Sequence, residues 1–263
     1  MIRLIKIGGN VVDNEELLLD FTAMLAKLEG DVVIVHGGGV MASRMQKAMG
    51  MEPLMIAGRR VTDEETLKVV TMVYAGWCNK HITAALQGCG RNSIGLTGAD
   101  GNAIKATRRA PLTVEGREVD YGFVGDVKPE GVNASFLKTL LSEGVTPVLC
   151  AINHDGNGNL LNTNADTIAS SVAVSLAEAG EEVELIFCFE KPGVLYDKDD
   201  DSSVIPVINP ELFLSLKAEG RVADGMLPKL ENAFKAIGRG VKQVVIKHAK
   251  DILNDNGTVL KNE

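Results

Sequence analysis

The sequence is poor in cysteine, and its cysteines show no pairing pattern. Four of them are scattered through 263 residues and form no C-x-x-C motif. A common zinc site, or the disulfide framework of a secreted domain, would need closely and regularly spaced cysteines. We therefore expect a cytoplasmic protein with free, mostly buried thiols. The cysteines are Cys78, Cys89, Cys150 and Cys188.

Long apolar runs and an excess of positive charge are also missing. No run approaches the roughly 18 residues that a membrane-spanning helix needs, and MIRLIKIGGN at the start lacks the apolar core of a signal peptide. The 27 Lys and Arg against 35 Asp and Glu give a net charge of −8, whereas a nucleic-acid-binding protein would need a basic stripe. We therefore expect small-molecule partners, and neither nucleic acid nor a membrane.

Several familiar catalytic motifs are absent. The sequence contains no G-x-G-x-x-G, no G-x-x-x-x-G-K-[ST] and no protein-kinase catalytic loop, which excludes the dinucleotide fingerprint, Walker-type NTPases and protein kinases. Histidine is scarce, with four residues, and none stands in a convincing arrangement of a base and its orienting partner. We expect His36 to pack at a glycine turn rather than to transfer a proton.

What the sequence does contain is a regular alternation of short β-rich runs and helical runs. This alternation predicts an α/β fold, a three-layer sandwich around a mostly parallel open sheet. A capping box, T-D-E-E, predicts that the longest helix begins at Thr62, and residues 103–127 read as hairpins. The expected strands are residues 2–7, 32–35, 93–96, 146–149, 184–189 and 243–246. The expected helices are residues 15–28, 40–49, 62–87, 133–142, 165–179, 210–219 and 226–238.

Two glycine clusters stand directly after predicted strands, at Gly8-Gly9 and Gly37-Gly38-Gly39. Glycine lets backbone N–H groups approach an anion closely, and a helix N-terminus adds the positive end of its dipole. Since ligands of open α/β sheets bind at the carboxyl ends of parallel strands, both clusters are candidate anion sites. Tight turns without a ligand remain the alternative for each.

Two lysines stand where a cation is costly unless an anion meets it. Lys6 lies inside an apolar strand. Lys229 falls in the first turn of a predicted helix, where a positive charge opposes the dipole. In LNTNAD, Asn162, Asn164 and Asp166 end an extended segment and enter a helix, so an ordinary Asn cap with an acidic first turn is the alternative there. By contrast, we expect the acidic stretch KDDDSS, residues 198–203, to be a solvated loop and no metal site.

These residues lie within motifs by which the sequence resembles the amino acid kinase superfamily, and within it the acetylglutamate kinase branch. The resemblance runs nearly end to end, and the ordered combination is specific. KIGG with HGGG would indicate only the superfamily, whereas GRRVT, FVGDV and LNTNAD together distinguish the branch from aspartokinase, uridylate kinase and carbamate kinase. The motifs are KIGGN (6–10), VIVHGGG (33–39), GRRVT (58–62), GWCNK (76–80), GLTGADG (95–101), FVGDV (123–127), LNTNAD (161–166), DGMLPK (224–229) and NGTVL (256–260).

The resemblance implies a fold, an activity and a division of labour along the chain. The fold is a single amino acid kinase domain, residues 1–263, with an amino-acid-binding lobe over about 1–165 and an ATP-binding lobe over about 166–263. The activity is ATP-dependent phosphorylation of the side-chain carboxylate of N-acetyl-L-glutamate, in arginine biosynthesis. Mg²⁺ is expected on the ATP phosphates. No general base is required, because a carboxylate acceptor is already ionised at pH 7.

The resemblance also assigns the site, position by position. Lys6 and Lys229 look like the two lysines that stabilise the transition state, and Asp166 looks like the residue that orients them. The acceptor contacts would be Gly38, Gly39, Arg60 and Asn162. The ATP and phosphate contacts would be Gly8, Gly9, Glu190, Gly193, Leu195 and Gly225.

One segment departs from the family pattern. Relatives carry a Thr/Ser-Asp pair where this chain reads FCFEKPGVL, residues 187–195, with Glu190 at the Asp position. This segment supports one alternative function, a non-catalytic nucleotide or amino-acid sensor.

A second alternative keeps the kinase and changes the acceptor to another N-acylglutamate, such as the N-succinyl compound, or to a carrier-linked amino acid. The same lysines and Arg60 would serve these acceptors, and only the pocket for the acyl group would differ.

The resemblance further implies a homodimer with closed two-fold symmetry. We expect its interface on the helix over residues 62–87, which carries four apolar side chains close together. These are Met72, Val73, Tyr74 and Trp77.

Overall fold

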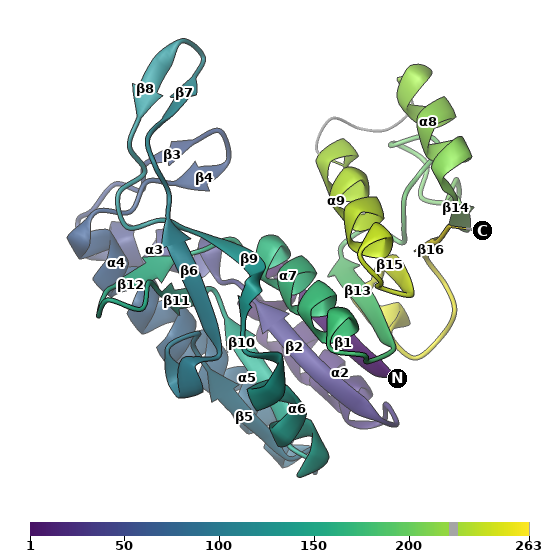
Figure 1. The fold of residues 1–263 in the computed structure, drawn as a ribbon, viewed down its shortest axis with the longest axis horizontal. Helices are drawn as coiled ribbons and strands as arrows, with labels where there is room; N and C mark the ends of the chain where they lie inside the picture. The colour runs from purple at the N-terminus through teal and green to yellow at the C-terminus, as the bar shows by residue number, and fades with distance from the viewer. Residues whose placement is uncertain (221–225, 263) are drawn as a thin grey trace.

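The computed structural model describes residues 1–220 and 226–262. Its centre is an eight-stranded sheet in the order β14-β16-β15-β13-β1-β2-β10-β5 (Figure 1). The neighbouring strands are parallel except that β16 runs antiparallel to β15. The predicted mostly parallel sheet is therefore confirmed. Its strands are β1 (Ile2–Ile7), β2 (Asp31–His36), β5 (Ser93–Leu96), β10 (Thr146–Cys150), β13 (Val183–Phe189), β14 (Val207–Ile208), β15 (Gln243–His248) and β16 (Thr258–Leu260).

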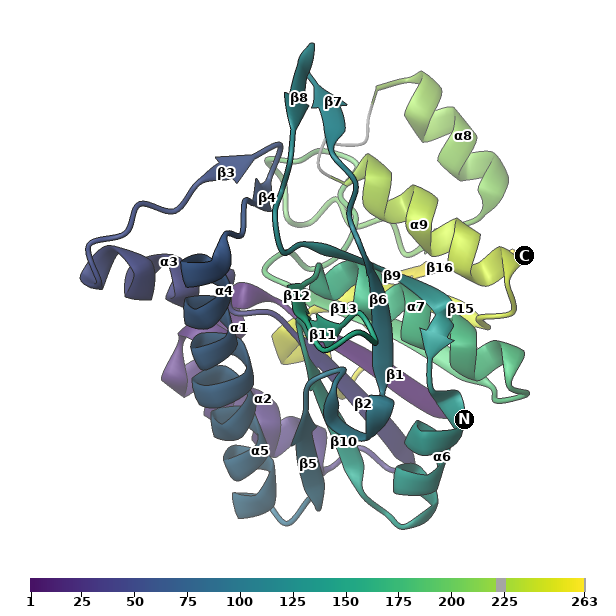
Figure 2. The same ribbon diagram turned by 60° about the vertical axis from the view of Figure 1, so that its left-hand side comes forward.

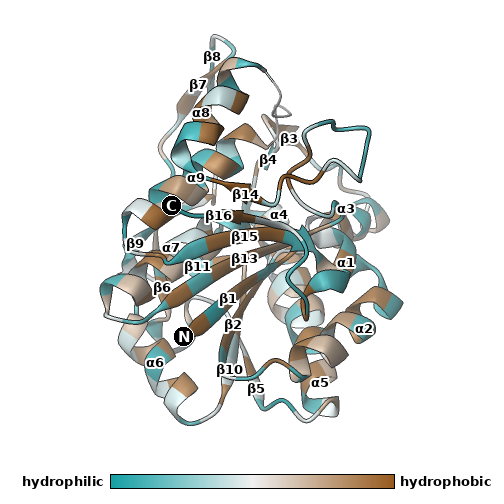
Figure 3. Ribbon diagram, turned by 90° about the vertical axis from the view of Figure 1, so that its right-hand side faces the viewer, coloured by the Kyte–Doolittle hydropathy of each residue, from teal (hydrophilic) through white to brown (hydrophobic). Residues whose placement is uncertain are grey.

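Helices cover both faces of this sheet and complete the three layers. Seen along the sheet, α1, α2 and α5 lie on one side and α6, α7 and α9 on the other (Figure 3). Because both faces are covered, β2 carries the continuous apolar run of residues 32–35, in which Val32, Val33 and Val35 are completely buried. The helices are α1 (Gly9–Asp13), α2 (Glu15–Ala26), α3 (Gly39–Ala48), α4 (Glu64–Thr71), α5 (Asn79–Gly88), α6 (Ala134–Ser142), α7 (Ala165–Glu178), α8 (Pro210–Ala218) and α9 (Leu227–Gly238). None of these described helices is long and apolar enough to cross a membrane.

A smaller sheet and two hairpins lie above the large sheet. The smaller sheet has the order β12-β11-β6-β9, and the hairpins β3–β4 and β7–β8 project at the same end of the molecule (Figures 1 and 2). The hairpin character expected for residues 103–127 is confirmed. These strands are β3 (Met55–Ile56), β4 (Arg59–Arg60), β6 (Ile104–Arg108), β7 (Leu112–Val114), β8 (Arg117–Val119), β9 (Gly125–Val132), β11 (Ile152–His154) and β12 (Leu160–Asn162).

The helix expected over residues 62–87 differs from the prediction in two respects. A π-helical segment, Met72–Cys78, separates α4 from α5, so that the winding changes in the middle. The prediction that Thr62 caps this helix is wrong, because the N-cap is Asp63, whose carboxylate accepts a hydrogen bond from the Thr66 N–H at 2.7 Å. Thr62 is instead completely buried, and its hydroxyl bonds to Asn162 and to the Arg60 carbonyl.

Candidate active site

Two adjoining cavities open at the carboxyl ends of β1 and β2. Cavity A has a volume of about 270 Å³ and lies beneath the β3–β4 hairpin. Cavity B has a volume of about 380 Å³ and lies toward α9 and the end of β13. Lys6 and Gly9 line both cavities, so the two spaces meet at the end of β1.

The two glycine clusters lie where the sequence places them, between a strand and a helix. Gly8 precedes α1, and a Cβ at this position would lie 2.9 Å from the Cys188 carbonyl oxygen. Gly38 precedes α3 with φ = 150°, and a Cβ there would lie 2.9 Å from the Tyr74 ring. Only glycine fits at either position. Gly37, Gly38 and Gly39 line cavity A, and Gly8 lines cavity B.

The three residues expected to be catalytic converge where the cavities meet. Lys6 Nζ lies 2.8 Å from Asp166 Oδ1, with Asp166 in the first turn of α7. Lys229, in the first turn of α9, lines cavity B, and its Nζ lies 3.9 Å from the centroid of the Phe189 ring. Lys6 Nζ lies 5.1 Å from the same centroid. The ammonium groups of Lys6 and Lys229 therefore both lie near the Phe189 ring, and that of Lys6 also pairs with the Asp166 carboxylate.

Lys229 has no ion pair among the described residues. Burial lowers the pKa of Lys229, nearby Asp166 raises it and nearby Lys6 lowers it again. A half-buried cation beside a second cation is costly unless an anion joins them. The arrangement thus fits a negatively charged group, such as a phosphate, between the two lysines.

The acceptor candidates Arg60 and Asn162 line cavity A and are held by protein hydrogen bonds. Arg60 Nη2 donates to the Gly39 carbonyl at 2.9 Å and to Ser43 Oγ at 2.8 Å, and Nη1 donates to Gln46 Oε1. Asn162 Nδ2 donates to Thr62 Oγ1 at 3.0 Å. Both residues are only 7% exposed. These acceptors engage three of the five guanidinium N–H groups, and Arg60 also lies beside the Tyr74 hydroxyl, whose pKa it lowers.

His36, at the end of β2, packs against the glycine turn as expected. Its Nδ1 donates to the Gly37 carbonyl at 2.8 Å, and its Nε2 accepts from Asn79 Nδ2 at 3.0 Å. Burial lowers the pKa of His36 to about 4. The imidazole is therefore neutral at pH 7 and has a structural role.

The nucleotide-side candidates are only partly brought together. Gly193 and the exposed Glu190 line cavity B, as do Gly8 and Gly9. Leu195 lines neither cavity, because its backbone forms a bridge with Val204 in the following loop. Gly225 lies outside the described residues.

The sequence interpretation missed three residues at cavity A. Arg59 and Tyr74 line it, and Asp13 lies nearby, with an Oδ2 that a Cβ on Gly9 would approach to 3.8 Å. Burial raises the pKa of Asp13 and Arg44 lowers it. The doubled arginine in GRRVT was a signal for Arg59, whereas no local pattern pointed to Asp13.

The apolar residues expected to form one dimer face do not do so. Met72 and Trp77 are 55% and 60% exposed, whereas Val73 and Tyr74 are buried, with 2% and 5% exposure. The four residues belong to the π-helical segment, whose consecutive side chains point in different directions. Placing Val73 and Tyr74 on the predicted interface is therefore wrong, since both side chains are buried and Tyr74 lines cavity A.

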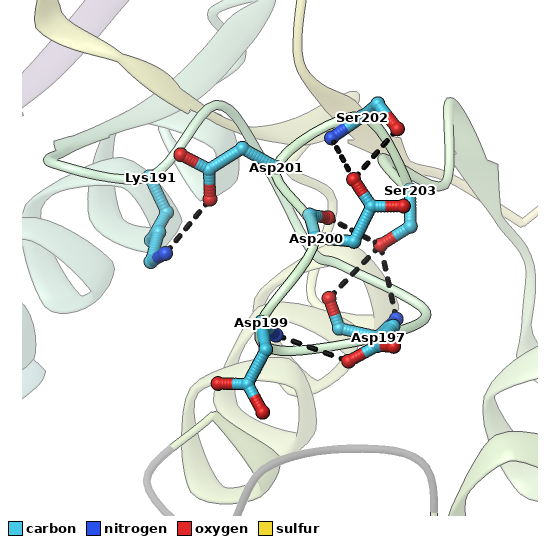
Figure 4. Close-up of polar contacts among 7 residues, drawn as sticks. All are labelled: Lys191, Asp197, Asp199, Asp200, Asp201, Ser202 and Ser203. Atoms are coloured by element: carbon cyan, nitrogen blue, oxygen red, sulfur yellow. Dashed lines mark hydrogen bonds and ion pairs between the residues drawn. The ribbon is translucent and has the colours of Figure 1, made fainter.

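The acidic stretch near residue 200 is a solvated loop, as expected. Asp200 accepts from the backbone and hydroxyl of Ser202, and Lys191 pairs with Asp201 at 2.7 Å (Figure 4). Within residues 1–220 and 226–262, no group of three His, Cys, Asp or Glu side chains could hold a metal ion. A magnesium ion in the candidate active site would be held mainly through the phosphates of its nucleotide.

The sequence matches the model of the amino acid kinase family over residues 1–248. It is 52% identical to the acetylglutamate kinase of Phocaeicola vulgatus, covering 99% of this chain and 98% of that protein. It is 40% identical to the acetylglutamate kinase of Methanopyrus kandleri, covering 98% and 100%. Solved structures of other proteins share the fold of this chain.

Among them, smu.665 of Streptococcus mutans superposes with a TM-score of 0.75 at 26% identity, covering 100% of this chain and 99% of that one. A carbamate kinase from Giardia superposes with a TM-score of 0.67 at 16% identity, covering 99% and 98%. The glycine turns at two strand ends, the Lys6–Asp166 ion pair and the nearby Lys229 lie within the region that matches the family model. This chain therefore belongs to the amino acid kinase family.

Proposed function

We propose that this protein transfers the γ-phosphoryl group of ATP to the side-chain carboxylate of N-acetyl-L-glutamate, in arginine biosynthesis. The observation that carries the proposal is the convergence of Lys6, Asp166 and Lys229 where cavities A and B meet. The names of relatives with about half of their residues identical supply the acceptor.

In this proposal, the acceptor occupies cavity A. The guanidinium of Arg60 and the amide of Asn162 bind its α-carboxylate, and the backbone of Gly38 and Gly39 lies alongside. The side-chain carboxylate then points toward Lys6. Because it is already ionised, the reaction needs no general base, which agrees with a neutral, buried His36.

The phosphoryl group is transferred between the two lysines. A carboxylate oxygen forms a bond to the γ-phosphorus as the bond to the ADP oxygen breaks, and no proton changes place. The equatorial phosphoryl oxygens carry spread negative charge in the transition state. Lys6 from β1 and Lys229 from α9 offset this charge from two sides, and Asp166 fixes the position of Lys6.

The nucleotide occupies cavity B in this proposal. Gly8, Gly9 and Gly193 offer a close approach to phosphates, and the exposed Glu190 stands where relatives carry Asp. Mg²⁺ bound to the phosphates would offset their charge. We assign the acceptor lobe to residues 1–165 and the ATP lobe to residues 166–263, and we place the enzyme in the cytoplasm.

We also propose a closed homodimer. The exposed Met72 and Trp77 lie on one segment of the N-terminal half, which supports an apolar contact there. Light scattering would give twice the chain mass, and Trp77→Ser would lower it toward that of one chain. A wild-type protein with the mass of one chain would contradict this proposal.

An assay of acyl phosphate formation tests the proposed activity. The protein is mixed with Mg-ATP and N-acetyl-L-glutamate, and hydroxylamine traps the product as a hydroxamate. We expect hydroxamate and ADP in equal amounts. ATP turnover that does not depend on any N-acylglutamate, or no turnover at all, would refute the proposal.

A further inference from the structure

The hydroxyl of Tyr74 is a hydrogen-bond donor at cavity A that the proposed function has not yet used. Tyr74 is buried and lines the cavity. It belongs to the π-helical segment Met72–Cys78, in which Met72 and Trp77 point outward and are more than half exposed. The winding of this segment thus turns the Tyr74 side chain inward, and π-helical segments are frequent at functional sites.

The ring and the hydroxyl of Tyr74 both lie against the second glycine turn. A Cβ on Gly38 would lie 2.9 Å from the ring, so the ring packs directly against the turn. A Cβ on Gly39 would lie 4.0 Å from the hydroxyl oxygen. Arg60, which lies beside the same hydroxyl, donates to the Gly39 carbonyl at 2.9 Å. The hydroxyl therefore lies where Arg60 and Gly39 meet, at the wall of cavity A.

The Tyr74 hydroxyl is protonated at pH 7 and keeps its proton for a ligand. Burial raises the pKa of Tyr74, Arg60 lowers it through its charge and a hydrogen bond, and Cys78 and Asp13 raise it, so that on balance it is raised. Since a guanidinium has no acceptor atom, Arg60 can only donate to the Tyr74 oxygen. Asp13 does not take the Tyr74 proton, because neither of its carboxylate oxygens has a hydrogen-bond partner among the described residues.

We propose that the Tyr74 hydroxyl donates a hydrogen bond to the α-carboxylate of the acceptor, beside Arg60. The inference rests on the proposed kinase function, in which Arg60 and Asn162 bind that carboxylate, and it adds a third side-chain donor to them. A hydroxyl that donates to a carboxylate forms a strong, charge-assisted hydrogen bond. Tyr74 is thereby a specificity residue, because an acceptor without an α-carboxylate would leave its buried hydroxyl poorly paired.

Tyr74→Phe tests the hydroxyl alone, because a phenylalanine ring can still pack against Gly38. Rates are measured at saturating Mg-ATP with N-acetyl-L-glutamate and with N-acetyl-L-isoglutamine, in which an amide replaces the α-carboxylate and the side-chain carboxylate remains. For N-acetyl-L-glutamate, the KM should rise about tenfold, as for the loss of a hydrogen bond to a charged group, with little change in kcat or in the KM for ATP. For the amide, kcat/KM should change less than about threefold, because the charged partner is already missing.

Tyr121→Phe is the matched control, because Tyr121 is also buried and lines neither cavity A nor cavity B. Its hydroxyl donates to the Ile56 carbonyl at 3.3 Å, so this variant loses a tyrosine hydroxyl outside the site. The ratio of kcat/KM between the two acceptors should stay unchanged in Tyr121→Phe and fall in Tyr74→Phe. Circular dichroism establishes that each variant is folded. Calorimetry with N-acetyl-L-glutamate alone measures binding without turnover, and weaker binding to Tyr74→Phe than to the wild type supports the contact.

The remaining outcomes overturn the inference in distinguishable ways. An unchanged KM for N-acetyl-L-glutamate in Tyr74→Phe removes the hydroxyl from the site and leaves the proposed function standing. An equal loss with both acceptors shows that Tyr74 supports the glycine turn without contacting the carboxylate. A lower kcat at an unchanged KM places the hydroxyl at the reacting group instead. A wild-type protein that neither converts nor binds N-acetyl-L-glutamate refutes both the function and the inference.

Discussion

Cavities A and B differ in how their charged side chains are held before any ligand binds. In cavity A, Arg60 and Asn162 are almost fully buried and hydrogen-bonded to protein atoms. In cavity B, Lys229 rests over the Phe189 ring without an ion pair in the described chain, and Glu190 is exposed. Cavity A, the acceptor side in the proposed function, is thus organised in advance, whereas cavity B, the proposed nucleotide side, keeps a lysine without an ion pair within the described chain.

Lys6 lines both cavities, and a comparison with Lys229 shows how a fixed cation differs from an unpaired one. Its partner Asp166 holds it at 2.8 Å, so its position depends little on the nucleotide. Lys229 has no such partner and depends on the anion that it binds. We therefore expect substitutions in cavity A to affect activity by displacing groups that are held in fixed positions. Substitutions of Lys229 should affect activity by removing its charge.

The largest expected effect comes from removing either lysine. Lys6→Ala and Lys229→Ala should each lower kcat by about 10²–10³-fold, with a smaller change in the KM for the acceptor, because both lysines contact the phosphoryl group mainly in the transition state. Steady-state kinetics measures both quantities. Lys217→Ala, which removes an exposed lysine paired with Glu231, is the control. An unchanged kcat in either test variant would remove that lysine from the mechanism.

The acceptor side should also respond to pH through His36. Its ordinary pKa is near 6.5 and its folded pKa is about 4, so the unfolded chain binds more protons between these values. Stability should therefore fall as the pH drops from about 6.5 to about 4, by about 3 kcal/mol in total from this group.

Urea unfolding of the wild type and His36→Asn across this range isolates the contribution. The variant should be less stable at pH 7 and should lose less stability on acidification. His81→Gln, at a partly exposed helical position, serves as the control. Parallel stability curves for the wild type and His36→Asn would show that His36 is not the titrating group.

The sequence predicted the elements that position the site, because their signals are local. Apolar runs locate β1, β2 and β13, and glycines after strands locate the turns at Gly8 and Gly38. Lys6 was recognised from a charge placed against its surroundings, whereas the role of Asp166 was assigned by the resemblance. Their contact at 2.8 Å follows from the topology, since α7 packs on the face of the sheet to which Lys6 points.

Other features depend on contacts that no local pattern encodes. Thr62 fits a capping box, but its hydroxyl is used by Asn162, a hundred positions away in the chain. Tyr74 resembles its apolar neighbours, and only the winding of the π-helical segment turns it into cavity A. Leu195 was assigned by resemblance alone, in the segment that departs from the family pattern.

Replacing Asp166 tests whether Lys6, which lines both cavities, is held in position before a ligand binds. Asp166→Asn keeps the shape of the side chain and removes the charge that holds Lys6. We expect kcat to fall by about ten- to a hundredfold, or about 1.4–2.7 kcal/mol. The pH–rate profile should keep its form, because no proton is transferred. If Asp166 were a general base, the wild-type profile would show an acidic limb that the variant lacks.

The smallest expected effect concerns Arg60, where charge and geometry can be separated. Arg60→Lys keeps the positive charge but cannot bond Gly39, Ser43 and Gln46 while also binding a carboxylate, since an ammonium has three donors and no planar fork. The KM for the acylglutamate should rise about tenfold, with a smaller change in kcat and little change in the KM for ATP. Arg117→Lys, on the exposed strand β8, should change none of these values. If the KM for ATP rises instead, Arg60 serves the nucleotide, and the distinction between a fixed acceptor side and a ligand-dependent nucleotide side fails at its best-defined residue.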